Sequence, residues 1–356
     1  MKPYRVLSLD GGGMRGVYTA ALIRNLCREF EKRRNCPSID FGSGFDLIVG
    51  TSTGAILAAA LAVGVDLDRI VNLYQEHGPR IFPKKVPSSF SRILVDMASR
   101  PKALASGAKA LEKALRDQLE EATFNKVYLE RGIALAITAV DFRTERARVF
   151  KTPHLGGQLD AEMLISDAVL ASSAAPIYRS LAKVYLDRKR QDPNHLYVDG
   201  GLWANNPVLV GLSEAVRASA TKQSIEIFSI GNCAPSTGQN HASDKLDLSY
   251  GEWRFGARVV STSIASQDQA FDDMSRFIGA RLTELGQSVT LCRFPRGEVP
   301  ADYHPILDID DASSEAMEAQ IRLAEDDCRL CLKLCDDLGN QDGQAISRLM
   351  RQVPTF

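Results

Sequence analysis

A serine flanked by small residues stands where a strand gives way to a helix. Residues 50–54 read Gly-Thr-Ser-Thr-Gly, which fits the G-x-S-x-G pattern of a nucleophile elbow around Ser52. An apolar run of strand length, residues 45–49, precedes the pattern, and an Ala/Leu-rich helical stretch, residues 53–63, follows it. Such an elbow needs small neighbours because its turn is strained; in the alternative interpretation, Ser52 only caps the helix. The small residues that the elbow requires are Gly50 and Gly54.

A run of glycines lies between the first expected strand and the first expected helix. Residues 10–16 read Asp-Gly-Gly-Gly-Met-Arg-Gly, after the apolar strand at 4–9 and at the start of a helix over 15–34. Consecutive glycines at a helix N-terminus leave backbone N–H groups free, which favours the binding of an anion. Two functions fit this loop: an oxyanion hole for acyl transfer, or a site for nucleotide phosphates.

The dinucleotide-binding alternative lacks one residue that its fingerprint requires. Three of the glycines satisfy G-x-G-x-x-G, but that fingerprint also requires an acidic residue at the end of a second strand about 20 positions on. Here residues 29–34 are still helical and highly charged, and the next strand ends at Gly50. The sequence therefore gives this interpretation little support. The glycines of the fingerprint are Gly11, Gly13 and Gly16.

An aspartate follows a third apolar strand and is followed by two glycines. Residues 199–201 read Asp-Gly-Gly directly after the strand at 196–198. An acidic residue at the carboxyl end of a strand stands where α/β sheets place their chemistry. Taken alone, the pattern also fits a simple turn. Together with the serine and the glycine loop, it predicts that Asp199 serves as the base.

No histidine is placed to complete a catalytic triad. One of the five stands before the strand of Asp199, at the wrong end of it, and none of the others follows a strand at the expected position. We therefore expect an aspartate that acts directly on the serine. A carboxylate is a weak base in water, so this arrangement requires burial and hydrogen bonding that raise its basicity. The histidines are His77, His154, His195, His241 and His304.

The order of elements predicts an α/β fold. Near-continuous apolar strands alternate with helices, which is typical of a mostly parallel sheet covered on both faces. Beyond residue 231 a polar stretch precedes two long helical segments around one strand-like run at 288–294. We expect a catalytic domain over residues 1–235 and a mainly helical C-terminal extension, residues 236–356, packed on it.

Composition excludes several classes of protein. The chain has 356 residues, with 43 Lys and Arg against 44 Asp and Glu, so its net charge of −1 provides no general attraction for nucleic acid. Seven cysteines, an odd number, suit a reducing cytoplasm rather than a disulfide framework. No apolar run reaches the roughly 20 residues of a spanning helix, and no metal-binding motif appears. We therefore expect a cytoplasmic protein, with only peripheral contact with membrane.

These motifs resemble the patatin-like phospholipase family, whose pattern is D-G-G-G-x-R-G, G-x-S-x-G and D-G-[GA]. All three are intact, and residues 171–176 (ASSAAP) and 205–207 (NNP) add to a likeness over about residues 5–231. The resemblance implies a three-layer α/β/α fold and a Ser–Asp dyad without metal or cofactor. It makes Ser52 the nucleophile and Asp199 the proton acceptor. The oxyanion hole that it implies consists of Gly11, Gly12 and Gly13, with Arg15 as supporting charge.

A narrower similarity is to CapV-type effectors, cyclic-dinucleotide-activated phospholipases of bacterial CBASS anti-phage systems. It rests on overall length, the early position of the first motif and the helical C-terminal third. It implies a phospholipase activated by a cyclic dinucleotide such as cyclic GMP-AMP, which degrades the host cell membrane from its inner face. A homo-oligomer is a further expected partner, and nucleic acid is not. Three alternatives stay open: a lipase without nucleotide gating, a different α/β serine hydrolase with a catalytic histidine, and a nucleotide-binding module that uses the glycine loop.

Two further segments have open interpretations. Residues 80–102 mix large apolar with basic side chains, which suits an anionic membrane interface but equally an amphipathic helix packed on the core. Arg293 and Arg296 stand on either side of a proline. They are candidates to meet a nucleotide phosphate, although single loop arginines are usually solvated.

Overall fold

The computed structural model describes residues 1–83, 90–186, 195–235, 246–249, 251–253 and 256–356, with backbone alone for residues 90–99 and Ala257. The segment at 80–102 that the sequence suggests for a membrane interface therefore lies partly outside the described residues. Among the described residues, no helix is both long and apolar enough to cross a bilayer.

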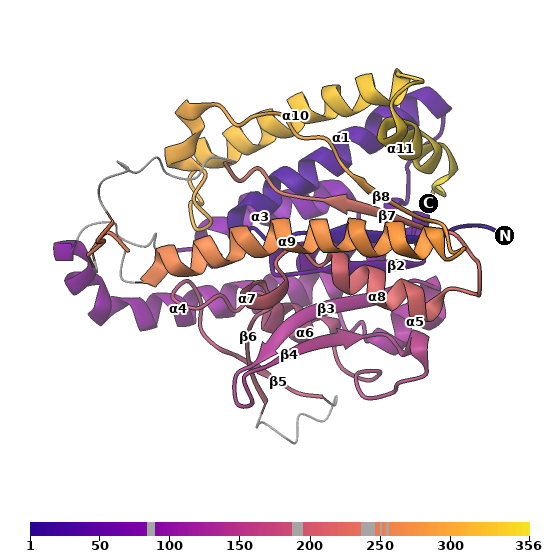
Figure 1. Ribbon diagram of the computed structural model, residues 1–356. Coiled ribbons are helices and arrows are strands. Elements are labelled where there is room, and N and C mark those ends of the chain that lie inside the picture. The colour runs from indigo at the N-terminus through magenta and orange to yellow at the C-terminus, as the bar shows by residue number, and fades with distance from the viewer. Residues whose placement is uncertain (84–89, 187–194, 236–245, 250, 254–255) are drawn as a thin grey trace.

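One mixed sheet forms the centre of the molecule (Figure 1). Five of its strands run parallel in the order β3-β2-β1-β7-β8. Each is rich in apolar residues on both faces, as expected of strands that are covered from both sides. The five strands are β1 (Tyr4–Leu9), β2 (Leu47–Gly50), β3 (Ala134–Asp141), β7 (Ile225–Ile230) and β8 (Val289–Arg293).

The other strands are antiparallel and gather around β3. Strand β4 (Arg146–Lys151) pairs with one edge of β3, from Ala136 to Asp141. The opposite edge is shared, because β2 pairs with the first half of β3 and β6 (His195–Asp199) with its last residues. Strand β5 (Ala182–Val184) pairs with β6 beyond it. As a result, β2 and β6 meet end to end along one edge of β3.

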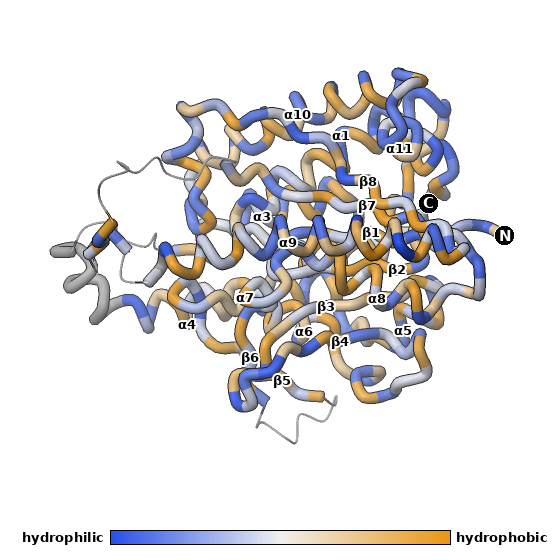
Figure 2. Tube along the Cα trace, in the orientation of Figure 1, coloured by the Kyte–Doolittle hydropathy of each residue, from blue (hydrophilic) through white to orange (hydrophobic). Residues whose placement is uncertain are grey.

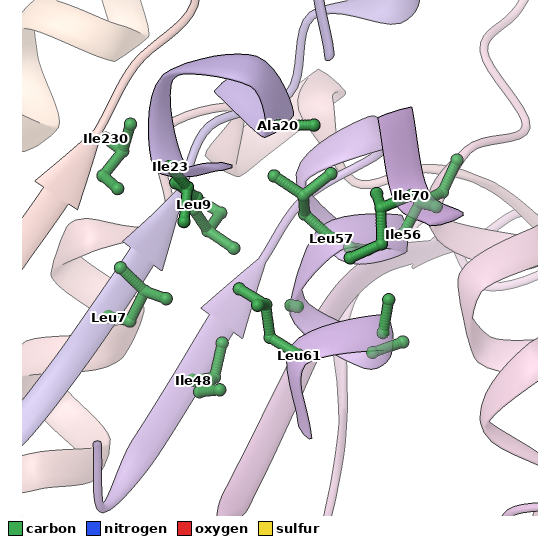
Figure 3. Packing of buried hydrophobic residues seen from close by; sticks show 14 of the residues in the cluster. Leu7, Leu9, Ala20, Ile23, Ile48, Ile56, Leu57, Leu61, Ile70 and Ile230 are labelled. Atoms are coloured by element: carbon green, nitrogen blue, oxygen red, sulfur yellow. The ribbon is translucent and has the colours of Figure 1, made fainter. Parts of the chain in front are cut away.

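Helices cover both faces of the sheet, and alternate strand residues supply two separate cores. Leu7, Leu9 and Ile48 belong to the larger core, packed against α1 and α2 (Figure 3). Val6 and Val49 point to the other face, toward α8 and the buried side of α9. The helices are α1 (Gly16–Arg34), α2 (Thr53–Val63), α3 (Leu67–Ile81), α4 (Phe90–Leu119), α5 (Phe124–Arg131), α6 (Ile165–Ser172), α7 (Gly201–Ala204), α8 (Val208–Ala218), α9 (Ala257–Glu284), α10 (Ser314–Asp336) and α11 (Gln341–Gln352).

The structure confirms the α/β fold class with a mostly parallel sheet. The expected helix over 53–63 is found at these residues, and Asp66 caps α3 as its type suggests, by accepting hydrogen bonds from two backbone amides. Helix α3 contains Pro79 in its last turn and ends two residues later, at Ile81.

The C-terminal third is part of the same sheet and core. Strand β8 pairs in parallel with β7, and α10 packs along α1 (Figure 1). Helix α10 alternates between hydrophilic and hydrophobic residues along its length, as expected of a helix that buries one face (Figure 2). The buried Tyr18 hydroxyl on α1 donates to an Asp327 carboxylate oxygen on α10, 2.6 Å away. A domain boundary at residue 235 stays a prediction.

We expect a chain that ends at residue 235 to lose its cooperative unfolding transition. The truncation would expose the edge of β7 and the apolar face of α1 that α10 covers. Circular dichroism and thermal unfolding of residues 1–235 and of the full chain measure this. A fragment that unfolds cooperatively near the midpoint of the full chain would instead support an independent domain with its boundary at 235.

Candidate active site

Ser52 stands at the strained turn between β2 and α2. Its φ of +54° and ψ of −122° lie in a region that residues other than glycine rarely adopt, and such strain is typical of functional sites. The turn leaves no room for larger neighbours. A Cβ atom on Gly54 would come within 2.2 Å of the Leu9 carbonyl oxygen, and one on Gly50 within 2.5 Å of the Gly54 carbonyl oxygen. These close contacts explain why both positions beside the elbow must be glycine.

The end-to-end meeting of β2 and β6 brings Ser52 and Asp199 together. Gly50 pairs with Ile137, and Asp199 pairs with Ala139, two residues further along the same edge of β3. The Ser52 hydroxyl donates to Oδ2 of Asp199 over 2.7 Å, and the Gly201 amide donates to Oδ1 over 2.7 Å. Both carboxylate oxygens are thus held, and one of them contacts the proton that a base would remove.

Burial makes this carboxylate a stronger base than an aspartate in water. Asp199 is 5% exposed, and its burial raises its pKa to about 6. The hydrogen bonds from Ser52 and Gly201, together with the nearby charge of Arg179, act in the opposite direction. At neutral pH the carboxylate is therefore ionised, yet its proton affinity is well above the usual one. This is the combination that a general base requires.

The described histidines lie elsewhere. The His154 ring contacts Glu214, and His304 contacts the Val299 carbonyl oxygen. His195 begins β6, at the opposite end of the strand from Asp199. Within the described ranges, no histidine lines the pocket that holds Ser52; His241 lies outside them.

The glycine loop lies against the elbow, but its amides are not equally free. The Gly11 amide donates to the Asn205 carbonyl oxygen over 2.9 Å, and the Gly12 amide to the Thr53 hydroxyl over 3.1 Å. The amide of Gly13 has no acceptor among the described residues. Gly13 has a φ of +60°, and a Cβ atom there would come within 2.1 Å of the Ile309 carbonyl oxygen. No larger residue fits at this position.

One further donor escaped the sequence analysis. The amide of Thr53 is the first of α2 and has no acceptor among the described residues. The residue after the nucleophile often contributes its N–H to the oxyanion hole of a serine hydrolase, so the G-x-S-x-G motif itself contained the signal. The roles of Gly11, Gly12 and Gly13 in the oxyanion hole stay predictions, as does that of Thr53.

Arg15 supports the loop from within. Its Nε donates to the Gly12 carbonyl oxygen over 3.1 Å. Burial lowers the pKa of its guanidinium, while Asp268 and Asp308 act in the opposite direction. The Arg15 side chain is thus bound to the glycine loop, where it is predicted to act as a supporting charge for the oxyanion hole.

Asp10, at the start of the loop, is anchored by the C-terminal third. It is 4% exposed, and its Oδ2 accepts a hydrogen bond from Arg293 Nη2 over 2.5 Å. Arg293 also donates to the Ser229 hydroxyl over 2.8 Å. Arg293 ends β8 and forms an ion pair with the buried Asp10, so it is not simply solvated; its contact with a nucleotide phosphate stays a prediction. Asp10 and Arg293 are 283 positions apart in the chain, so no short-range sequence pattern indicates that they pair.

Two asparagines hold the same loop by its carbonyl groups. The Gly11 carbonyl oxygen accepts from Asn232 Nδ2 over 2.5 Å and from Asn205 Nδ2 over 3.3 Å. Asn205 also contacts Asp268 of α9, both carboxylate oxygens lying 3.1 Å from its Nδ2. Burial, with the charge of Asp10, raises the pKa of Asp268 to about 7. Helix α9 and β8 therefore both reach the loop.

An apolar pocket opens onto the dyad, and it is narrow. Its walls come from both parts of the chain, and α9 contributes Val260 and Ile264. The cavity measures about 90 Å³, against roughly 300–1,000 Å³ for typical small-molecule sites. The remaining lining includes Ile56, Tyr74, Ile81, Phe82, Leu111, Tyr178, Arg179, Leu202 and Ile309.

Comparison with known families matches residues 7–220 to patatin-like phospholipases. The chain belongs to the patatin-like phospholipase family. A cGAMP-activated phospholipase of Vibrio cholerae is 29% identical over 322 residues, 88% of this chain and 87% of its own. A protein of the same name from Pseudomonas aeruginosa is 33% identical over 277 residues, 77% of this chain and 74% of its own. A cUMP-AMP-activated phospholipase of Escherichia coli is 33% identical over 239 residues, 64% of each chain.

Membership in the patatin-like phospholipase family confirms the hydrolase class predicted from the motifs. The narrower similarity to cyclic-dinucleotide-activated members is confirmed as a likeness, since these relatives bear that name. Within the described ranges, no group of three His, Cys, Asp or Glu side chains could hold a metal ion.

We expect kcat/KM of this patatin-like phospholipase to fall about tenfold per pH unit below pH 6, as Asp199 becomes protonated.

The same raised pKa of Asp199 means that the native state holds this proton more tightly than the unfolded chain. The resulting stabilisation is present below about pH 4 and is lost as pH rises through 6. Asp199→Asn should therefore abolish activity and raise the melting temperature at pH 8, with little change at pH 4. A rate that is constant from pH 8 to pH 5, or an Asn variant that melts earlier at pH 8, contradicts this assignment.

Proposed function

We propose that this protein hydrolyses acyl esters of membrane glycerophospholipids through a Ser52–Asp199 dyad. The observation that carries the proposal is the 2.7 Å hydrogen bond from the serine hydroxyl to a buried carboxylate with a pKa of about 6. The apolar side chains along the pocket suit the acyl chain of such a lipid.

Each step uses groups of this chain together with substrate and water. The Ser52 oxygen bonds to the ester carbonyl carbon while its proton passes to Asp199, and negative charge develops on the carbonyl oxygen. The free amides of Gly13 and Thr53 are candidates to receive that charge, together with Gly12 once its amide leaves the Thr53 hydroxyl. Collapse breaks the ester bond, and the lysophospholipid leaves with the proton from Asp199.

The acyl-enzyme then reacts with water. Asp199 accepts a proton from the attacking water, whose oxygen bonds to the acyl carbon. Collapse of this second intermediate breaks the bond to Ser52, which regains its proton from Asp199. The products are a free fatty acid and the original enzyme, so one pair of side chains serves both halves of the reaction.

We further propose that a cyclic dinucleotide, with cyclic GMP-AMP as the first candidate, switches the enzyme on. The names of the relatives support this, and so does the pocket of about 90 Å³, which is too small for an acyl chain. Because Val260, Ile264 and Ile309 narrow the pocket, movement of these segments would open it. The proposed setting is the inner face of the bacterial membrane, where a peripheral enzyme degrades the host's own lipids in anti-phage defence. Assembly into a homo-oligomer stays a prediction.

The test is fatty-acid release from mixed phospholipid vesicles, with and without a panel of cyclic dinucleotides that includes cyclic GMP-AMP and cyclic UMP-AMP. We expect release by the wild type with one nucleotide, and a loss of at least about a thousandfold in Ser52→Ala, since the nucleophile is removed. Release without any nucleotide would keep the phospholipase and discard the gate. No release under any condition, or full release by Ser52→Ala, would overturn the proposed chemistry.

A further inference from the structure

A buried arginine faces the catalytic pocket from the turn that follows α6. Arg179 lines the same cavity as Ser52 and Asp199, and it is 8% exposed. Its backbone amide donates to the Ala175 carbonyl oxygen over 2.8 Å, which fixes the turn. No motif in the sequence marks this arginine.

Among the described residues, the guanidinium of Arg179 has no hydrogen-bonded or ion-pair partner. The contact that it makes is with the ring of Phe82, 5.9 Å away. One other described arginine is buried to this degree, Arg5, and it is fully engaged: its Nε lies 3.0 Å from Glu226 and its Nη2 lies 2.5 Å from Gln352. A buried charge ordinarily requires such pairing, so Arg179 departs from the rule.

The unpaired side chain still carries its charge. Burial lowers the pKa of Arg179 to about 10, and the Asp199 carboxylate acts in the opposite direction. At neutral pH the guanidinium is therefore protonated, in an apolar pocket where its attraction for an anion is little screened.

Arg179 does not serve simply to hold the base. Oδ1 of Asp199 already accepts from Gly201, and Oδ2 accepts from Ser52. No ion pair joins Asp199 and Arg179 among the described contacts, so the arginine acts on the carboxylate only through its field. Its five N–H donors remain available to another group in the pocket.

The backbone beside Arg179 is strained. Ile177 has a φ of +75°, which is a rare value for a β-branched residue and has an energetic cost. Arg15, the other cation at this pocket, is already bound to the Gly12 carbonyl oxygen. The strained turn thus presents to the space beside the dyad a cation whose guanidinium has no hydrogen bond among the described residues.

We propose that Arg179 binds the phosphodiester of the substrate lipid while the neighbouring ester is at Ser52. This inference rests on the proposed function. In a glycerophospholipid the phosphate is attached to the glycerol carbon next to an ester-bearing carbon, so an ester in the pocket brings the anion close to the dyad. The planar guanidinium fork matches the oxygens of a phosphodiester. Arg179 then selects phospholipids over uncharged acylglycerols.

The experiment compares two soluble substrates that differ only in the phosphate headgroup, dihexanoylphosphatidylglycerol and dihexanoylglycerol, in the presence of the activating nucleotide. For Arg179→Gln we expect kcat/KM to fall at least tenfold on the phospholipid and less than about threefold on the neutral ester, because a charge-assisted contact is lost with one of them alone. Arg179→Lys should recover part of the loss. The matched control is Lys183→Gln, which removes an exposed cation from nearby β5 and should match the wild type on both substrates.

Three outcomes would overturn this role for Arg179. Equal losses on both substrates, with a displaced acid limb of the pH profile, would make Arg179 a positioning residue for Asp199. Loss of nucleotide binding in Arg179→Gln, measured by calorimetry, would assign the phosphodiester to the activator instead. If the wild type hydrolyses both substrates and Arg179→Gln shows no selective loss on the phospholipid, this inference alone is contradicted. If the wild type hydrolyses neither substrate, the proposed function is contradicted as well.

A stability measurement guards against misfolding. Arg179→Gln gives up no ion pair within the described part of the chain, so its melting temperature should equal or exceed that of the wild type. A large decrease in melting temperature would show that the arginine is a structural residue and would count against the proposal.

Discussion

The catalytic site depends on one hydrogen bond between residues 147 positions apart, from the Ser52 hydroxyl to Asp199. That bond exists because two strands of opposite direction share one edge of β3 and meet at their carboxyl ends. A fully parallel sheet would place these chain ends side by side, at least one strand spacing apart. The antiparallel β6 instead points its last residue at the elbow, so one of the antiparallel strands of this mostly parallel sheet assembles the dyad.

The apolar enclosure of the pocket explains the electrostatics on both sides of the serine. The same loss of solvent raises the pKa of Asp199 and lowers that of Arg179. Both groups remain charged at neutral pH, but each is less stable in that state than it would be in water. Each therefore gains from meeting a partner during the reaction: a proton for the carboxylate and an anion for the guanidinium.

What the sequence could predict was local. The elbow and the glycine loop each lie within one strand–turn–helix unit, so the residue types at short spacing indicated both the structure and the chemistry. Strand β8 in the main sheet, the partner of Arg293 and the exposure of Arg179 to the pocket depend on contacts between residues far apart in the chain. Periodicity and composition carry no record of such contacts, and that is why the ion pair of Arg293 was not foreseen and Arg179 was missed.

The ion pair between Asp10 and Arg293 has a consequence for biosynthesis. The ribosome releases the N-terminal residues first, so Asp10 and the glycines after it emerge long before their anchor has been made. Until β8 joins the sheet, the Asp10 carboxylate lacks its cation, and the loop lacks the support that α9 gives it through Asn205. The glycine loop can therefore acquire these contacts only after the C-terminal third of the chain has been synthesised.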